Sequence, residues 1–170
     1  MRAEQWIAAV VAQYRALQPQ YDQLHIVGMC MGALLALVLS EQVRHTAEQG
    51  KLALLASPVY LDGWSVPWYA GLRRAFYLVP PIASRMKVEE GEPYGVKNAL
   101  VRAVIKAKFE RGDHFHYRWV PLSSVHEVDR LRARVFACAH NIQAPTLIIH
   151  AREDEPVSYT HLTLPTICSV

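Results

Sequence analysis

Cysteine is scarce in this sequence, and the pattern of its few cysteines excludes several classes of protein. The three residues are Cys30, Cys138 and Cys168, an odd number at no spacing typical of a metal site. A framework of disulfide bonds is therefore not expected, and a reducing cytoplasm is the predicted location. We expect neither a metal ion nor another cofactor.

The chain also lacks long apolar runs and a large net charge. Its longest apolar run, IVGMCMGALLALVL, contains two glycines and stops short of the roughly 18–20 residues that a membrane span needs. No basic segment precedes an apolar one at the N-terminus, so no secretory signal is expected. A formal net charge of +3, without a basic stripe interleaved with aromatic residues, argues against a nucleic-acid partner.

What the sequence does contain is typical of a globular protein of the α/β class. Apolar residues make up 52% of the 170 residues and charged residues 19%, which is enough for one domain with a core. Residues 3–17 carry apolar residues at helical spacing. LHIVG (24–28) and KLALLAS (51–57) are continuous apolar runs, as in strands of a parallel sheet covered on both faces, and MGALLALVLSEQ (31–42) between them is an apolar helix. This alternation predicts α/β layering.

A long insertion separates these elements from a further predicted strand. Residues 60–141 are rich in aromatic residues near their start and contain two predicted helices, at 96–110 and 124–138. APTLIIHAREDE (144–155) then returns to an apolar run followed by a polar turn. We interpret residues 60–141 as a cap over the carboxyl edge of the sheet, where ligands bind in open α/β sheets.

Cys30 stands where the first predicted strand turns into a helix, between Gly28 and Gly32. A nucleophile at such a corner needs small residues two positions to either side, because larger side chains would collide in the sharp turn. The turn would place the thiol at a helix N-terminus, which favours a thiolate, and the N–H of Met31 would stabilise an oxyanion. The alternative is that Cys30 is only a small buried apolar residue.

The segments LHIVGMCMGALLAL and PTLIIHARED resemble the α/β-hydrolase fold, and most of all its carboxylesterase, monoacylglycerol lipase and serine aminopeptidase-like branch. The resemblance implies a mostly parallel sheet with a helical cap, here a partial fold truncated at both ends. Residues 1–59 and 142–156 would form the core and residues 60–141 the cap. It also implies that Asp154, in the turn after the last strand, is the acid of a catalytic triad.

The family usually has serine where this chain has Cys30. Within the same fold, dienelactone hydrolases and polyester synthases carry a cysteine at this corner. A thiolate forms an acyl thioester in the same geometry, so the substitution is compatible with covalent chemistry. It leaves the substrate class and the acyl acceptor open.

The expected triad lacks its histidine, because the family's chain order is nucleophile, acid and then histidine. Only His161 follows Asp154, and the family places a further helix and strand between acid and base. His161 lies in VSYTHLTLPT (157–166), which matches one reading frame of a transposon end used to tag DNA for sequencing. We therefore expect residues 157–170 to be a non-native tail. We also expect Met1 to be an internal methionine and the catalytic histidine to lie outside this chain.

We expect four other histidines to be structural rather than catalytic. His25 and His150 belong to predicted strands or their ends, where histidines usually pack. His114 and His116 have a metal-like spacing, but no cluster of cysteines or carboxylates accompanies them. No metal site is predicted.

The predicted function is hydrolysis of carboxylic esters or thioesters that carry small apolar acyl groups. Trp64 and Trp68 are candidates for lining the acyl pocket under the cap, although aromatic segments are often plain core. Two alternatives stay open: an acyltransferase that uses the same corner, and a non-catalytic member of the fold that binds an apolar ligand. The expected partner is a small acyl molecule.

Overall fold

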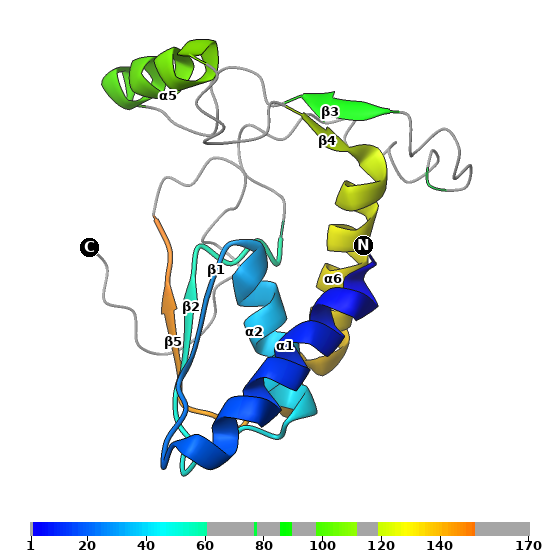
Figure 1. Ribbon diagram of the computed structural model, residues 1–170, viewed down its shortest axis with the longest axis vertical. Coiled ribbons are helices and arrows are strands. Elements are labelled where there is room, and N and C mark those ends of the chain that lie inside the picture. The colour runs from blue at the N-terminus through cyan, green and yellow to red at the C-terminus, as the bar shows by residue number, and fades with distance from the viewer. Residues whose placement is uncertain (1, 61–76, 78–85, 90–97, 112–118, 152–170) are drawn as a thin grey trace.

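A three-stranded parallel sheet organises the protein, in the order β1-β2-β5 (Figure 1). Its strands are β1 (Ile26–Met29), β2 (Leu52–Leu55) and β5 (Thr146–Ile149). This computed structural model describes residues 2–60, 77, 86–89, 98–111 and 119–151. The predicted α/β layering is confirmed in these residues.

The register of the sheet brings the ends of all three strands into one row. β1 pairs with β2 so that Met29 lies opposite Leu55, and β2 pairs with β5 so that Leu55 lies opposite Ile149. Because the strands are parallel, the chain leaves all three at the same edge. The residues that follow them, Cys30 among them, therefore gather at the carboxyl edge of the sheet.

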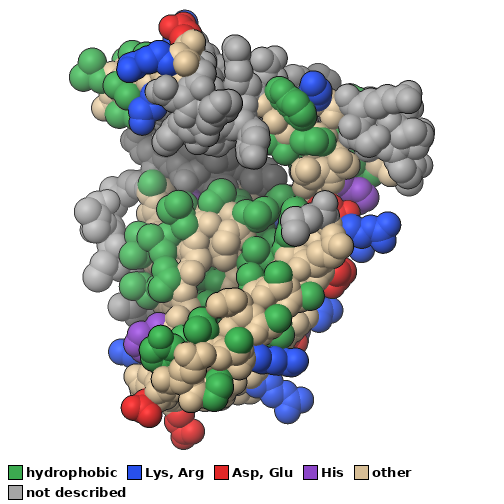
Figure 2. Space-filling view, viewed as in Figure 1, with side chains coloured by type: hydrophobic (Ala, Val, Ile, Leu, Met, Phe, Trp, Pro, Cys, Tyr) green, Lys and Arg blue, Asp and Glu red, His purple; other side chains and the backbone are tan. Residues whose placement is uncertain are grey.

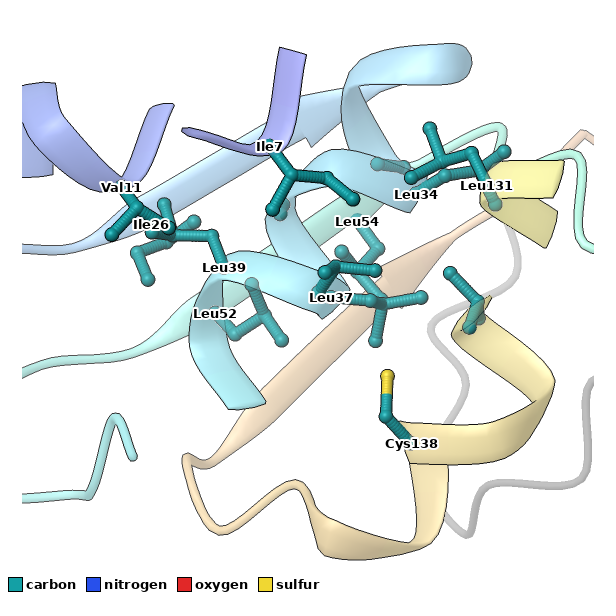
Figure 3. Packing of buried hydrophobic residues seen from close by; sticks show 14 of the residues in the cluster. Ile7, Val11, Ile26, Leu34, Leu37, Leu39, Leu52, Leu54, Leu131 and Cys138 are labelled. Atoms are coloured by element: carbon teal, nitrogen blue, oxygen red, sulfur yellow. The ribbon is translucent and has the colours of Figure 1, made fainter. Parts of the chain in front are cut away.

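Three helices cover one face of this sheet. The apolar helix α2 (Met31–Gln42) packs directly on β1 and β2, and α1 (Ala3–Leu17) and α6 (Leu122–Cys138) pack on α2. Figure 3 shows side chains of all these elements meeting in one cluster. Leu34, Leu54 and Leu131 lie at its centre with 2% exposure or less. This apolar burial is the main stabilisation of the fold.

The described residues leave the other face of the sheet uncovered. Val27 and Met29 of β1 are 68% and 70% exposed, and Leu147 and Ile149 of β5 are 48% and 44% exposed. Figure 2 shows hydrophobic side chains at the surface in this region. The continuous apolar runs predicted a sheet covered on both faces. These exposed apolar side chains of β1 and β5 are the ones that a second covering layer would bury.

The remaining described elements lie, as α6 does, in the predicted insertion, or are short helical turns. They are β3 (Lys87–Glu89), α5 (Ala99–Arg111), β4 (Trp119–Pro121), and the 3-10 helices η1 (Gln18–Gln20) and η3 (Ala139–Asn141). The strands β3 and β4 pair antiparallel, which the sequence did not predict. No helix among the described residues is long and apolar enough to cross a membrane.

Two helix starts differ from those predicted by the sequence. The helix predicted at 96–110 begins at Ala99, because the side chain of Asn98 caps it by accepting bonds from the N–H groups of Leu100 (3.0 Å) and Val101 (3.2 Å). The helix expected to open with Ser124 begins two residues earlier, directly after Pro121. Proline fixes the φ angle of the backbone just before the first helical turn, and it has no N–H group that would need a hydrogen-bond partner there.

A buried histidine at the far end of α2 makes the stability depend on pH. His45 is fully buried, and its Nδ1 shares a hydrogen bond of 2.9 Å with the hydroxyl of Tyr14. Burial lowers the pKa of His45, and the charge of nearby His25 lowers it further. The histidine is therefore neutral in the folded state under conditions in which the unfolded chain takes up a proton.

We expect the free energy of unfolding to fall as the pH drops below about 6.5, the ordinary histidine pKa. Below that value the unfolded chain binds more protons than the folded one, so stability rises with pH in this window and is complete above it. Urea unfolding at pH 7.5 and pH 5.5 measures the difference. The variant His45→Gln should show a smaller change in the free energy of unfolding between these two pH values. A change equal to that of the wild type would assign the pH dependence to other groups.

Candidate active site

The backbone turns sharply at Cys30, between the end of β1 and the start of α2. Cys30 has φ 50° and ψ −124°, a left-handed conformation that residues other than glycine adopt at a cost of about 1–3 kcal/mol. Two backbone bonds hold it: its N–H donates to the carbonyl of Leu55 and its carbonyl accepts from the N–H of Ala33, each at 2.9 Å. A strained strand-to-helix turn of this kind is typical of a nucleophile elbow.

The two glycines that flank Cys30 have different roles in this turn. A Cβ atom on Gly28 would lie 2.3 Å from the carbonyl oxygen of Gly32, far inside contact distance. A Cβ on Gly32 would meet nothing within 4 Å among the described residues outside its own helix. The close approach therefore needs glycine at position 28, and position 32 contributes its backbone. The sequence motif predicts the same steric role for both glycines, and the structure assigns it to Gly28 alone.

Cys30 is exposed, which excludes the alternative that it is a buried apolar residue. Cys138 is the contrasting case, since it is 3% exposed and burial raises the pKa of its thiol. Met31, as the first residue of α2, has an N–H group without an intrahelical partner. The thiol and an available backbone donor thus come from adjacent residues at a helix N-terminus.

The strand that carries the predicted acid ends at the same edge as Cys30. Ile149 lies in the row of Met29, with β2 between them, so the two strands are about 10 Å apart at the usual spacing. Asp154 follows five residues later and lies outside the described residues. Its role as the acid therefore stays a prediction, supported by the shared edge.

Several other candidate residues also lie outside the described part of the chain. They are Trp64, Trp68, His114, His116 and His161. Among the residues described, no cluster of three or more histidine, cysteine or acidic residues is placed to hold a metal ion.

The histidines of the sheet occupy opposite ends of it. His25 precedes β1 at the end remote from Cys30, and its Nδ1 accepts a bond of 3.0 Å from the N–H of Lys51. It therefore links the starts of two strands, at the end of the sheet remote from Cys30. His150 follows β5 at the carboxyl edge and is half-buried.

An ion pair on α6 beside this edge was not singled out from the sequence. Asp129 and Arg132 face each other across one helical turn, with 2.8 Å between Oδ1 and Nη1. Their spacing of three residues on a predicted helix is the signal that identifies such a pair. The position of this pair near the ends of the strands depends on tertiary packing, which the sequence does not reveal.

The sheet order, the helix positions and the strained turn define the α/β-hydrolase fold. Residues 5–162 match the family described as Hydrolase_4, serine aminopeptidase, S33, so the chain belongs to this family, as its sequence motifs predicted. No curated protein matches the chain.

Two solved structures share the fold at low sequence identity. The crystal structure of a monoacylglycerol lipase from Paleococcus ferrophilus matches with a TM-score of 0.66 and 14% identity, over 92% of this chain and 57% of that one. A structure from work on LipS and LipT, two metagenome-derived lipolytic enzymes, matches with a TM-score of 0.61 and 19% identity, over 92% and 56%. The chain thus spans little more than half the length of these proteins.

Proposed function

We propose that this chain carries the nucleophile and acid of a hydrolase acting on carboxylic esters or thioesters with small apolar acyl groups. The observation that carries the proposal is the exposed thiol of Cys30, held in a strained turn at the carboxyl edge of the sheet. Such strain persists only where the surrounding structure maintains it, and it clusters at functional sites. Family membership and the lipolytic structural neighbours support the same class of reaction.

The proposed reaction follows from this geometry in two steps. The catalytic histidine takes the proton of the Cys30 thiol, the resulting thiolate attacks the acyl carbonyl, and the N–H of Met31 stabilises the oxyanion of the tetrahedral intermediate. Collapse forms an acyl thioester and expels the alcohol or thiol, which takes a proton from the catalytic histidine. Water then attacks the thioester, releases the acid and restores the thiol. Asp154 would orient the histidine, which we place outside this chain.

We expect the 170-residue chain alone to show no efficient steady-state hydrolysis. Without a positioned histidine, the thiol and the attacking water lack a base and the leaving group lacks an acid, and general acid–base catalysis typically contributes about 100- to 10,000-fold. Hydrolysis of p-nitrophenyl butyrate and a butyryl thioester by the purified chain measures this. Ordinary turnover would show that residues within the chain supply the base.

The acyl acceptor is tested with a longer protein that includes the histidine. Hydrolysis predicts that the free acid is the product even when an alcohol or a thiol is added. Capture of the acyl group by the added alcohol or thiol would identify a transferase on the same nucleophile. Tight binding of the ester without turnover would favour a binding protein.

A further inference from the structure

Arg132 of α6 connects this helix to the chain that leaves β2. Its Nε donates to the carbonyl oxygen of Val59 at 2.9 Å, and its Nη1 donates to Oδ1 of Asp129 at 2.8 Å. The side chains of Arg132 and Asp129 are only 14% and 16% exposed, so solvent screens the pair less than it would a surface ion pair. Bonds that involve charged groups are the stronger class of hydrogen bond.

The segment that Arg132 binds borders the nucleophile elbow. We define residues 56–60 as the crossing segment, because they lead from the end of β2 to contacts with α6. Leu55, directly before it, accepts the N–H of Cys30, and Ala56 donates its own N–H to the carbonyl of Ile149 at 2.9 Å. The start of the crossing segment is therefore bonded beside both neighbouring strand ends.

The crossing segment holds an unfavourable backbone conformation. Ala56 has φ 45°, which a non-glycine residue adopts only where its surroundings enforce it. Val59 donates its N–H to the carbonyl of Ser57 at 3.0 Å, so the chain turns again within three residues. Arg132 binds the carbonyl of that same Val59, at the point where the turn ends.

Further contacts connect α6 with residues that precede it in the predicted insertion. The ring of Tyr60 packs edge-to-face on Phe136, with 5.0 Å between the centroids. Tyr77 stacks on His126 at 4.1 Å and donates its hydroxyl to Oδ2 of Asp129 at 2.8 Å. Asp129 thus accepts a bond from Arg132 on one oxygen and from Tyr77, 52 positions earlier in the chain, on the other.

The opposite face of α6 is fixed in the core. Leu131 and Val135 are 0% and 1% exposed and belong to the cluster around α2. Arg132 therefore projects from a rigid support, which is what positioning a strained loop requires. The exposed Arg134, two residues further along the same helix, has no bond of this kind among those described.

We propose that Arg132 is a positioning residue of the acyl-transfer site. It holds the crossing segment against α6 and thereby maintains the edge at which Cys30, the chain after β2 and the chain after β5 meet. Asp129 orients the guanidinium for this role. The role in catalysis rests on the proposed function, whereas the structural link between Arg132 and the crossing segment does not.

Amide hydrogen exchange in the 170-residue chain tests the link directly. In Arg132→Gln we expect the amides of Ala56 and Val59 to exchange about 10- to 100-fold faster, the change that corresponds to losing a charged hydrogen bond. The bonded amides of Ile26 and Leu52, in the same sheet, should keep their rates. Unchanged rates at 56 and 59, or a uniform rise through the sheet, would overturn the proposal.

Two further variants complete the test. Arg134→Gln, which removes an exposed cation from the same helix, should leave all four exchange rates unchanged. Asp129→Asn keeps the side-chain size but removes the charge that orients Arg132, so it should accelerate exchange at 56 and 59 less than Arg132→Gln. If Arg132→Gln does not fold, Asp129→Asn tests the link between Arg132 and the crossing segment instead. Wild-type exchange rates at residues 56 and 59 in Asp129→Asn would then overturn the proposal.

Kinetics in a longer protein that includes the histidine test the functional half. We expect Arg132→Gln to lower kcat/KM about 10- to 100-fold at unchanged folded fraction, since small displacements of a reacting group have effects of this size. Arg132→Lys should recover only part of the loss, because an ammonium group cannot reproduce the planar fork that bonds two acceptors. Wild-type kcat/KM in Arg132→Gln would refute the positioning role. An inactive wild type would refute the proposed function, and hydrogen exchange would still decide the link.

Discussion

Cys30→Ala is expected to abolish acyl turnover in a protein that carries the complete triad. The substitution removes the group that forms the covalent bond in the proposed mechanism and leaves the backbone donors in place. Loss of a triad nucleophile costs about a millionfold in kcat in a well-studied protease, so we expect at least about a thousandfold here. Initial rates with a p-nitrophenyl ester measure the loss, and mass spectrometry of the stopped reaction should show no acyl adduct.

Two other cysteine variants make this result specific. Cys30→Ser keeps a nucleophile in the same strained turn and should retain measurable turnover, because serine is the family's usual residue there. Cys138→Ala removes the other cysteine of the described residues, which is buried beside α2, and should lower stability while leaving the rate per folded molecule unchanged. If Cys30→Ala keeps full turnover, the covalent mechanism is wrong.

The elements of the sheet could be predicted from the sequence because their information is local. Continuous apolar runs identified β1, β2 and β5, and the corner at Cys30 followed from two glycines placed between a strand and a helix. Gly28 permits the close approach of β1 and α2, so the motif itself indicates the geometry of the turn. The parallel pairing of the three strands then fixed which residues share the carboxyl edge.

What the sequence did not reveal depends on contacts between distant residues. The strands β3 and β4 have three residues each, too few for a periodic pattern, and they pair across about thirty positions. Similarly, the bond between Arg132 and Val59 joins residues 73 positions apart. Neither residue type is unusual in its own segment, and only the packing of α6 on α2 brings them together.

The sequence motif also does not distinguish the different roles of Gly28 and Gly32. Both glycines satisfy the same motif, but only one of them faces the backbone of the other. Which glycine is indispensable depends on the direction in which a Cβ atom would point. The motif therefore predicts the turn correctly and cannot by itself predict the effect of each substitution.

Gly28→Ala is expected to destabilise the fold by about 3 kcal/mol or more. The added Cβ would lie 2.3 Å from the carbonyl oxygen of Gly32 and 2.7 Å from the Cα of Ala33, and neither is a flexible side chain that can move aside. Relieving the clash requires α2 to shift from β1, which disturbs the centre of the core and the turn at Cys30. Overpacking of this kind typically costs about 1–3 kcal/mol, and a clash between two backbones belongs at the upper end or beyond.

Gly32→Ala is the matched control, since the same methyl group is added four residues away on the other side of the turn. It meets nothing within 4 Å among the described residues, and alanine is favoured over glycine inside a helix by about 0.5–1 kcal/mol. We therefore expect unchanged or slightly raised stability in Gly32→Ala and a large loss in Gly28→Ala, measured by urea unfolding of both proteins. Equal losses in the two variants would mean that α2 lies farther from β1 than the distances at Gly28 state. In that case the close contact of β1 and α2 would not be what holds the strained turn at Cys30 in place.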